Sequence, residues 1–293
     1  MNSSANKIPS IVLITGDDFE HRYMANKLAS EIQLRAIVVD HGKKQRFLER
    51  INRLWRRYTI RELLSRVTLA GLRSAWGDRV ARERALTLRF SRKACSAFND
   101  VSLLRHVSGI NTQQGQQLVA SLEPDVLLVF GTGIVGNKVL SMTRRIALNL
   151  HTGISPYYRG CDCSFWPVHN EELSLLGATV HECTKDVDGG KIFGTVQAKP
   201  QAGDGLFDIF ARCVIAGAQL YSDTVQALCK GELHATFQDL KVGTEYKASM
   251  RGIRAEWRTR RKLKAGLIAS YFARMNRPED QEASAHSAPS FQH

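Results

Sequence analysis

The first forty residues alternate between apolar runs and one amphipathic stretch. Residues 8–16 (IPSIVLITG) are apolar, β-branched and end in glycine, which predicts a strand buried on both faces of a sheet. Residues 19–33 repeat their apolar side chains at helical spacing, and residues 36–40 (AIVVD) form a second short apolar run. A strand, a helix and a strand in this order make a βαβ unit, whose strands are parallel and joined by a right-handed crossover.

The same patterns continue to about residue 230. In chain order they predict a strand and turn at 101–110, a helix at 112–122, a buried strand and Gly-rich turn at 124–135, a strand at 145–151, a helix at 164–173, a hairpin-like strand pair at 177–184 and 192–200, and a helix at about 205–230. Alternating strands and helices predict an α/β fold, with a mostly parallel twisted sheet flanked by helices.

Two segments carry the excess positive charge of the chain, which has a net charge of +13. Residues 43–93 contain 16 Lys and Arg against 4 Asp and Glu, and residues 241–264 contain 9 against 2. The first segment predicts a basic insertion of two or three amphipathic helices, with turn signals near Gly71 and Gly77. Such segments attract polyanions, anionic membranes or phosphorylated small molecules; the plain alternative is that they are solvated helix faces.

Length and composition fit one large domain, or a core domain with an appendage. The 293 residues are 43% hydrophobic, which is ample for a core, and no apolar run is long enough to span a membrane. The N-terminal residues lack the features of a secretory signal, so a cytoplasmic protein is expected. The six cysteines, including the pair Cys161 and Cys163, are expected to be reduced packing residues rather than metal ligands. No metal site is predicted.

Polar side chains gather after the strand at 145–151. Asn149 and His151 are two positions apart at its end and therefore project to the same side, at the sheet edge where α/β folds bind ligands. Asp188 lies in the glycine-containing turn DVDGG. An amide, an imidazole and a carboxylate suit attack on a carbonyl, because they stabilise an oxyanion, move protons and orient the imidazole. Alternatively, all three are ordinary turn and loop residues.

A second candidate motif follows the strand at 124–130. GTGIVG at 131–136 completes the glycine pattern of a dinucleotide-binding turn, but the acidic residue expected further on is missing. Nicotinamide or flavin binding is therefore not favoured.

Two blocks of the sequence resemble the folate-dependent formyltransferases. NLHTGISPYYRG at 149–160 resembles their signature N-x-H-x-S-L-L-P-x-Y-R-G, and GATVHECTKDVDGGKI at 177–192 resembles their block in which T-x-H precedes a D-x-x-D-x-G turn. The second block looks closest to glycinamide ribonucleotide formyltransferase, and the Y-R-G loop looks more like methionyl-tRNA and sugar N-formyltransferases. The resemblance covers roughly residues 120–205 and implies a Rossmann-like formyltransferase fold.

The resemblance also implies roles for individual residues. Asn149, His151 and Asp188 fall on the catalytic residues of the family. The co-substrate 10-formyltetrahydrofolate would contact two loops, formed by Gly131, Thr132, Gly133, Ile134 and Val135 and by Thr184, Lys185, Asp186 and Val187. Tyr157, Tyr158 and Arg159 are candidates for acceptor contacts, because such a loop can stack on a ring and pair with a phosphate. Phe165 and Trp166 are expected in the core, and His169 and His181 as structural or surface residues.

The chain departs from the family pattern at three places. Gly153 stands where the family has Ser, and Ser155 replaces a Leu, so a reshaped loop is expected. Asp17 and Asp18 would repel the phosphate of a purine precursor. The residues after 205 predict helices and a polar tail rather than the C-terminal barrel of the methionyl-tRNA enzymes.

The expected activity is therefore formyl transfer from 10-formyltetrahydrofolate to a small amine, plausibly an amino sugar carried on a nucleotide. Alternatives are a glycinamide ribonucleotide or methionyl-tRNA formyltransferase, a formyltetrahydrofolate hydrolase, or a polyanion-binding protein. Residues 8–235 would form the catalytic domain, including the insertion at 43–93. Residues 236–277 would form a basic extension, and residues 278–293 a disordered tail. Nucleic acid is not favoured as a partner, and a homodimer is left open.

Overall fold

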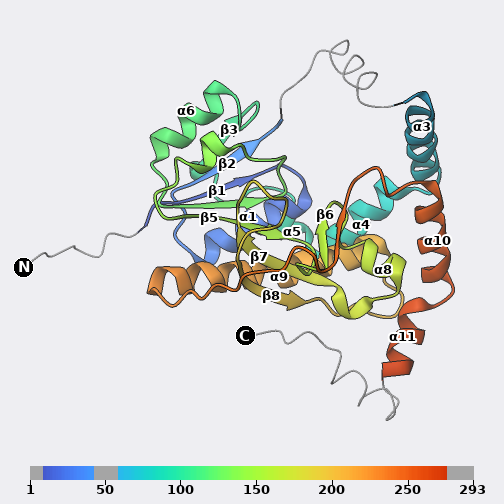
Figure 1. The fold of residues 1–293 in the computed structure, drawn as a ribbon. Coiled ribbons are helices and arrows are strands. Elements are labelled where there is room, and N and C mark those ends of the chain that lie inside the picture. Colours follow the sequence, from blue (N-terminus) through green and yellow to red (C-terminus); the bar gives the residue numbers. More distant parts are fainter. Residues whose placement is uncertain (1–8, 43–58, 276–293) are drawn as a thin grey trace, which may run out of the picture.

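A seven-stranded sheet forms the centre of the molecule, in a computed structural model that describes residues 9–42 and 59–275 (Figure 1). Its strand order is β3-β2-β1-β4-β5-β7-β8. The strands are β1 (Ile11–Thr15), β2 (Ala36–Asp40), β3 (Leu104–Val107), β4 (Val126–Phe130), β5 (Ile146–His151), β7 (Gly177–Glu182) and β8 (Ile192–Gln197). The first five are parallel, and β7 and β8 add antiparallel strands at one edge.

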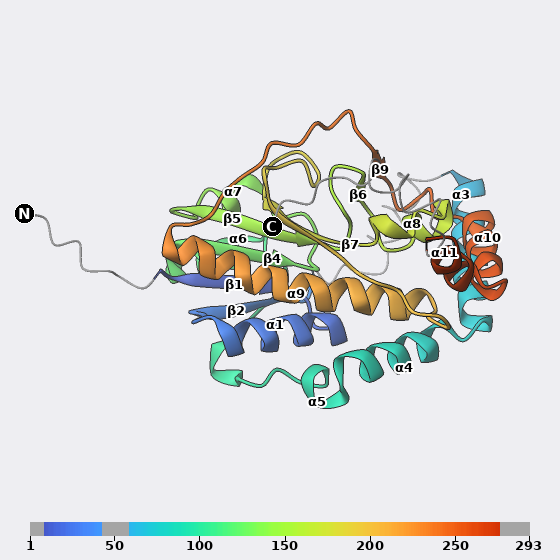
Figure 2. The ribbon, with the colours of Figure 1, turned by 90° about the horizontal axis from the view of Figure 1, so that it is seen from below.

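Helices cover both faces of the sheet, and further helices lie at one end of the molecule (Figure 1). The helices are α1 (Phe19–Glu31), α3 (Ile60–Ala75), α4 (Asp78–Phe90), α5 (Arg92–Cys95), α6 (Gln113–Leu122), α7 (Asn137–Leu140), α8 (Trp166–Asn170), α9 (Leu206–Lys230), α10 (Ile253–Lys264) and α11 (Leu267–Met275), with short 3-10 turns at Val101–Leu103 and Leu173–Leu175. One core cluster joins α1, α4 and α9 to one face, and a second joins α6 and α7 to the other (Figure 2). The buried strands are apolar on both sides because both faces are covered.

The βαβ unit and the strand pair after residue 176 confirm the sequence predictions. β1, α1 and β2 follow in the predicted order, and β1 pairs with β2 in parallel. β7 pairs with β8 in antiparallel register, as expected for a hairpin. The predicted helix at 164–173 is shorter than expected: α8 ends at Asn170 and has a proline in its first turn.

The part of the basic insertion that the structure describes contains α3, α4 and α5. The predicted turn at Gly77 is confirmed, since this residue lies between α3 and α4 with φ of 71°. The turn predicted near Gly71 is wrong, because Gly71 lies inside α3. An isolated glycine weakens a helix but does not break it, and the capping residue Thr59 and the amphipathic pattern of α3 outweigh that cost. Residues 43–58, with their predicted apolar spacing, and the tail 278–293 lie outside the described residues.

A small second sheet joins the central loop to the C-terminal extension. β6 (Tyr158–Gly160) pairs in parallel with β9 (Thr244–Tyr246), and neither strand was predicted. Three-residue strands have no measurable periodicity, so their pairing is decided by the tertiary structure. In the described part of the chain, no helix is both long and apolar enough to cross a membrane.

Candidate active site

The candidate site lies where β4 and β5 end. These strands are parallel neighbours, and Val129 of β4 is the register partner of Asn149 of β5. The carboxyl ends of parallel neighbours meet at one edge of a sheet, so the turn that starts at Gly131 and the side chain of His151 emerge at the same edge. This is the placement that the sequence pattern predicted.

Asp188 brings two histidines together. The loop between β7 and β8 folds back over the sheet, so that Asp188 Oδ2 lies 3.3 Å from Nδ1 of His151 and Oδ1 lies 3.2 Å from Nε2 of His181. The backbone N–H of Gly160 also donates to Oδ2, over 2.7 Å. The carboxylate is therefore held between β5, β6 and β7, and its position depends on all three.

Each imidazole directs one nitrogen at a main-chain carbonyl and the other at Asp188. Nε2 of His151 lies 2.9 Å from the carbonyl oxygen of Tyr158, and Nδ1 of His181 lies 2.9 Å from that of Glu182. A carbonyl only accepts, so these nitrogens carry the protons of the neutral rings. The remaining nitrogen of each ring faces the carboxylate, so a proton at this point is shared between an imidazole and Asp188.

Asn149 belongs to the same cluster. It is the antiparallel register partner of His181, and its Nδ2 lies 3.1 Å from Nε2 of that ring. One amide hydrogen serves this contact, and the second is free to donate elsewhere. The structure thus brings together Asn149, His151 and Asp188, the three residues that the sequence proposed for catalysis.

Burial sets the protonation states of the cluster. Desolvation lowers the pKa of His151 below 6.5 and outweighs the opposing attraction of Asp188. For Asp188, burial alone would raise the pKa of the carboxyl, but His151, His181 and the hydrogen bond from Gly160 together hold it well below its usual range. At neutral pH the site therefore contains a neutral imidazole and an ionised carboxylate, as a proton acceptor requires.

Gly153 is required by close packing under His151. A Cβ at this position would lie 2.5 Å from Nε2 of His151 and 2.5 Å from Cβ of Cys163. Cys163 is buried and fills the space that a side chain at 153 would need. This explains why the loop departs from the family pattern here. The hydroxyl of Ser155 is buried without a hydrogen-bond partner among the described residues.

The loop that follows is held by the protein itself. Tyr158 is buried, its hydroxyl bonds to Glu172 and Asn170, and its ring stacks on Tyr246. Arg159 is also buried and donates to the carbonyl of Leu240 over 3.0 Å.

Of the three predicted acceptor contacts, Tyr157 alone is half-exposed. Phe165 and Trp166 are buried, as expected for core residues.

The two segments expected to hold the folate are largely exposed. Ile134 is 84% exposed and Val187 43%, and the backbone from Thr184 to Val187 lies at the surface. Asn111 fixes the first segment, since it donates to the carbonyl of Ile134 and accepts from the N–H of Gly136. Val135, the last residue of the first segment, and Cys183, which directly precedes the second, pack against the same core cluster. Both segments therefore lie beside the same face of the sheet.

A cavity of about 320 Å³ lies between α3 and the segment before α10. Its walls include Arg66 and Arg73 of α3, Arg251 and Asp162. Asp162 is two residues from Gly160, and so lies within about 8 Å of the residue that donates to Asp188. Asp162 thus connects the wall of this cavity to the segment that follows Gly160, and the basic insertion forms another of its walls.

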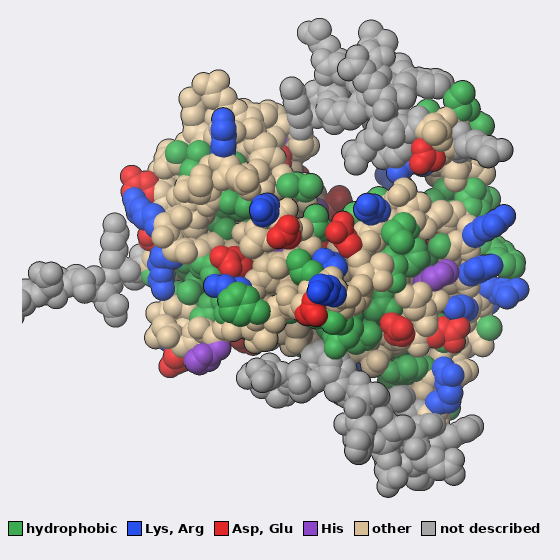
Figure 3. All heavy atoms as spheres, in the orientation of Figure 1, with side chains coloured by type: hydrophobic (Ala, Val, Ile, Leu, Met, Phe, Trp, Pro, Cys, Tyr) green, Lys and Arg blue, Asp and Glu red, His purple; other side chains and the backbone are tan. Residues whose placement is uncertain are grey.

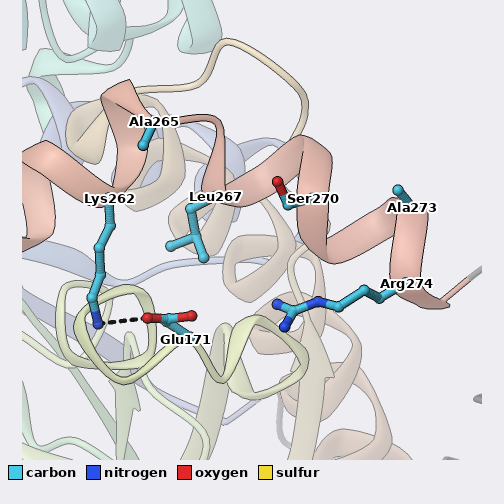
Figure 4. A pocket seen from close by; sticks show the side chains of 7 residues that line it. All are labelled: Glu171, Lys262, Ala265, Leu267, Ser270, Ala273 and Arg274. Carbon is cyan, nitrogen blue, oxygen red and sulfur yellow. Dashed lines mark ion pairs between the residues drawn. The ribbon is translucent and has the colours of Figure 1, made fainter.

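Another cavity, of about 500 Å³, lies at the junction of α10 and α11 (Figure 4). Lys262 pairs with Glu171 across it, over 2.8 Å. None of its lining residues belongs to the cluster around Asp188.

One group of side chains in the described part of the chain has the spacing of metal ligands. Asp18, Glu20 and His21 place one ligand atom each within 4.8 Å of one another. Arg82 already donates to Glu20 over 2.5 Å and lies 3.8 Å from Asp18. Its guanidinium supplies the positive charge that these acids need.

Comparison with known proteins shows similarity to formyltransferases in sequence and in fold. Over 131 residues the chain is 28% identical to a methionyl-tRNA formyltransferase of Thermotoga neapolitana, a match that covers 44% of this chain and 42% of that protein. No family model matches the chain. A 4-N formyltransferase from Francisella tularensis has a similar fold, with a TM-score of 0.50 at 13% identity over 82% of this chain and 77% of that one.

An N-formyltransferase from Helicobacter canadensis, solved with folinic acid and dTDP-3-aminofucose, also has this fold. Its TM-score is 0.51 at 11% identity, over 81% of this chain and 70% of that one. The chain is similar to the formyltransferases in fold and, over 131 residues, in sequence. At these identities the solved structures bear on the fold alone. The matched segment spans less than half of the methionyl-tRNA enzyme.

His181 is the residue of the cluster to which the sequence assigned no functional role. It was expected to be structural or on the surface, and it is buried, 3% exposed, with Nε2 3.2 Å from Oδ1 of Asp188. The signal was available, because His181 is the histidine of the T-x-H pattern in the formyltransferase-like block. Its antiparallel register with Asn149 could not be read from that pattern.

Proposed function

We propose that this protein transfers the formyl group of 10-formyltetrahydrofolate to the amine of a small acceptor. The observation that carries the proposal is the convergence of Asn149, His151, His181 and Asp188 at the carboxyl end of β5. The neutral imidazole of His151 beside the ionised carboxylate of Asp188 suits removal of a proton from an attacking amine. The free amide hydrogen of Asn149 suits stabilisation of the oxyanion that forms on the formyl group.

In the proposed transfer, Asn149 stabilises the oxyanion, and His151 and Asp188 move the proton. The acceptor nitrogen attacks the formyl carbon, and the carbonyl oxygen gains the negative charge that Asn149 stabilises. The proton released by the nitrogen passes to the acceptor cluster and is shared between His151 and Asp188. From there it is delivered to the departing folate nitrogen. The contact between His151 and the Tyr158 carbonyl fixes the ring, so that Nδ1 remains directed at the carboxylate.

The two exposed segments, residues 131–135 and 184–187, are the proposed folate contacts. Both lie beside the same face of the sheet, and the first follows the strand next to β5. Exposed backbone N–H and carbonyl groups suit the hydrogen-bonding edge of a pterin ring. The Helicobacter canadensis neighbour was solved with folinic acid, which supports a folate co-substrate here.

The cavity beside Asp162 is the proposed place for the acceptor. Arginines from α3 and from the segment before α10 line it, and Arg73 and Arg251 among them pair with Glu256. A guanidinium has five N–H donors, so these groups can keep that pairing and still donate to an acceptor that carries phosphate, as an amino sugar nucleotide does. The dTDP-3-aminofucose bound by the Helicobacter canadensis neighbour supports this class.

The test is an acceptor screen with purified protein and 10-formyltetrahydrofolate. Release of tetrahydrofolate is followed with amino sugar nucleotides, glycinamide ribonucleotide and methionyl-tRNA. Turnover with an amino sugar nucleotide is expected. The Asn149→Ala, His151→Ala and Asp188→Ala variants should each lose about 10²- to 10⁴-fold in kcat/KM, because each removes a proton-transfer or oxyanion group.

His106→Ala provides the matched control. His106 is exposed at the end of β3, where its ring stacks on that of His41, and its loss should leave turnover unchanged. Full turnover in the His151 variant would contradict the mechanism. Release of formate without any acceptor would identify a hydrolase, and turnover only with methionyl-tRNA would replace the proposed acceptor class.

A further inference from the structure

The outward face of α10 carries a row of basic side chains around a tryptophan. Its members, all exposed and within one face by their helical spacing, are Arg254, Trp257, Arg258, Arg261 and Lys264. Trp257 is 52% exposed, and the guanidinium of Arg261 lies 4.8 Å from the centre of its ring. The space-filling view shows blue side chains along this edge of the molecule (Figure 3).

The opposite face of α10 is fixed to the rest of the molecule. Glu256 is fully buried there and pairs with Arg73, Arg251 and Arg260. Thr259, also buried, bonds to His169 over 2.8 Å. The inward arginines therefore have acidic partners, and the rotation of the helix is fixed.

The outward row differs from the inward arginines. Across the described ranges, no ion pair joins any of its four cations to an acid. Like charges along one helix face repel one another, so this arrangement is costly unless an external anion offsets it.

Exposed aliphatic side chains lie at the same end of the molecule. On α3, Ile60 is 64% exposed, Leu64 62% and Val67 71%, and their spacing places them along one stripe. Leu69 and Arg73 occupy the other side of this helix, where Leu69 is buried and Arg73 pairs with α10. A row of large aliphatic side chains in water indicates a surface that meets an apolar partner.

Two views place α3 and α10 at the same end of the molecule (Figures 1 and 2). In Figure 3 green side chains of the α3 region stand next to the blue side chains of α10 along one margin. We propose that this end docks on an anionic membrane surface, with the α10 row on lipid phosphates and the α3 stripe among the headgroups. Basic residues combined with exposed aliphatic and Trp side chains are typical of helices that bind the membrane interface.

A membrane fits this surface better than a nucleic acid does. Lys, Arg and Trp can bind either partner, since they pair with phosphates and stack on bases. Ile60, Leu64 and Val67 have no comparable partner on RNA, whereas aliphatic side chains enter the headgroup region of a bilayer. The proposal does not depend on the proposed formyl transfer and stands or falls separately from it.

The test is co-sedimentation of the full chain with lipid vesicles. Vesicles of phosphatidylcholine alone are compared with vesicles that also contain phosphatidylglycerol, at low and at high salt. The partition coefficient should be about tenfold or more higher on the anionic vesicles, and should fall as salt screens the row. Arg258→Glu with Arg261→Glu should remove this preference, and Leu64→Asn with Val67→Asn should weaken binding several-fold.

A matched control makes the same charge change elsewhere. Arg35 and Lys230 are exposed, and no ion pair involving either occurs in the described residues. Arg35 precedes β2 and Lys230 ends α9, both away from α3 and α10. Arg35→Glu with Lys230→Glu should leave vesicle binding unchanged within twofold. Circular dichroism and thermal unfolding confirm that each variant is folded.

Three results would overturn the proposal. The first is equal binding to neutral and anionic vesicles, or an equal loss in the control pair. The second is tight binding to homopolymeric RNA, unaffected by the Leu64 and Val67 substitutions, without binding to vesicles. The third is a lower melting temperature of the Leu64/Val67 variant with unchanged vesicle binding, because the stripe would then be covered within the chain.

Discussion

At the scale of single residues, neighbouring groups fix the orientation of the side chains around Asp188. Main-chain carbonyls fix one nitrogen of His151 and one of His181, so the other two face the carboxylate. Burial lowers the pKa of His151 below 6.5. A histidine kept neutral in the fold binds its proton more weakly than in the unfolded chain, so its contribution to stability is present above pH 6.5 and is lost as the pH falls below it.

Gly153 is the residue whose substitution tests this packing most directly. Gly153→Ala would place a Cβ 2.5 Å from His151 Nε2 and from Cys163 Cβ, so the imidazole must move. We expect a loss of about 1–3 kcal/mol in the free energy of unfolding, as for other overpacked positions. Because the ring then leaves Asp188, formyl transfer should fall at least as sharply as in His151→Ala. Urea denaturation and tetrahydrofolate release measure the two effects.

Gly71→Ala is the control for this substitution. Gly71 lies inside α3 with no heavy atom within 4 Å of an added Cβ. Alanine there should stabilise the protein by about 0.5–1 kcal/mol, since it restores helix propensity, and should leave turnover unchanged. Equal effects of both substitutions would show that the space beneath His151 is open.

At the scale of elements, α9 supports the strands that end at the site. Tyr221 of α9 is fully buried, and its hydroxyl accepts from the N–H of Val129 over 2.9 Å and donates to the carbonyl of Leu148 over 2.8 Å. These two residues belong to β4 and β5, and Val129 is the register partner of Asn149. One hydroxyl thus ties the central helix to both strands directly behind the candidate site.

Tyr221→Phe should therefore destabilise the fold. It removes both hydrogen bonds of a fully buried hydroxyl, at a cost of about 1–3 kcal/mol. Urea denaturation measures this loss. Tyr271→Phe is the matched control, because Tyr271 is half-exposed on α11 and should change stability by less than about 0.5 kcal/mol. Equal stability of wild type and Tyr221→Phe would show that α9 is held by apolar packing alone.

At the scale of the whole molecule, Glu256 joins the basic insertion to the C-terminal extension. The carboxylate on α10 is fully buried and pairs with Arg73 of α3, with Arg251 and with Arg260. Burial alone would raise its pKa, but these arginines hold the pKa of Glu256 below 4.5. Arg73 and Glu256 are 183 residues apart in the chain, and a second ion pair, between Arg260 of α10 and Asp78 of α4, also joins the two basic segments.

Glu256→Gln should loosen this junction. It leaves three guanidinium groups without their shared charge, and because these are partly exposed we expect a loss of about 2 kcal/mol rather than the 3–5 kcal/mol of a fully buried pair. Since the folded pKa is lowered, the stabilisation by Glu256 is present above pH 4.5. It is lost as the pH falls through the folded value, so the difference between wild type and variant shrinks in acid.

Two measurements check this prediction. Urea denaturation at neutral and acid pH gives the free energy difference, and hydrogen exchange should show faster opening of α3 and α10. Glu245→Gln serves as the control, because Glu245 is exposed on β9 and should change stability by less than about 0.5 kcal/mol. An unchanged exchange rate in both helices would mean that other contacts, such as the ion pair of Arg260 with Asp78, hold the junction.

The periodicity of apolar residues was sufficient to predict those helices and strands that are long or buried on both faces. β1, β2, β4 and β5 and the 25-residue α9 are confirmed near their predicted bounds, because apolar runs and helical spacing report burial directly. β6 and β9 were missed because their three residues contain no period. Gly71 was misread as a turn because a glycine signal is local, whereas the helix around it is stabilised along its full length.

The sequence by itself determined the parallel α/β order and the placement of Asn149 and His151 at a strand end. These features follow from local pattern and from the two-residue alternation of a strand. The tertiary structure alone decided that the β7–β8 loop carries Asp188 back to two histidines, and that Cys163 fills the space above Gly153. It also decided that Glu256 gathers arginines from both basic segments. Such contacts join residues that are distant in the chain, and the local spacing of residues does not predict which distant side chains will be in contact.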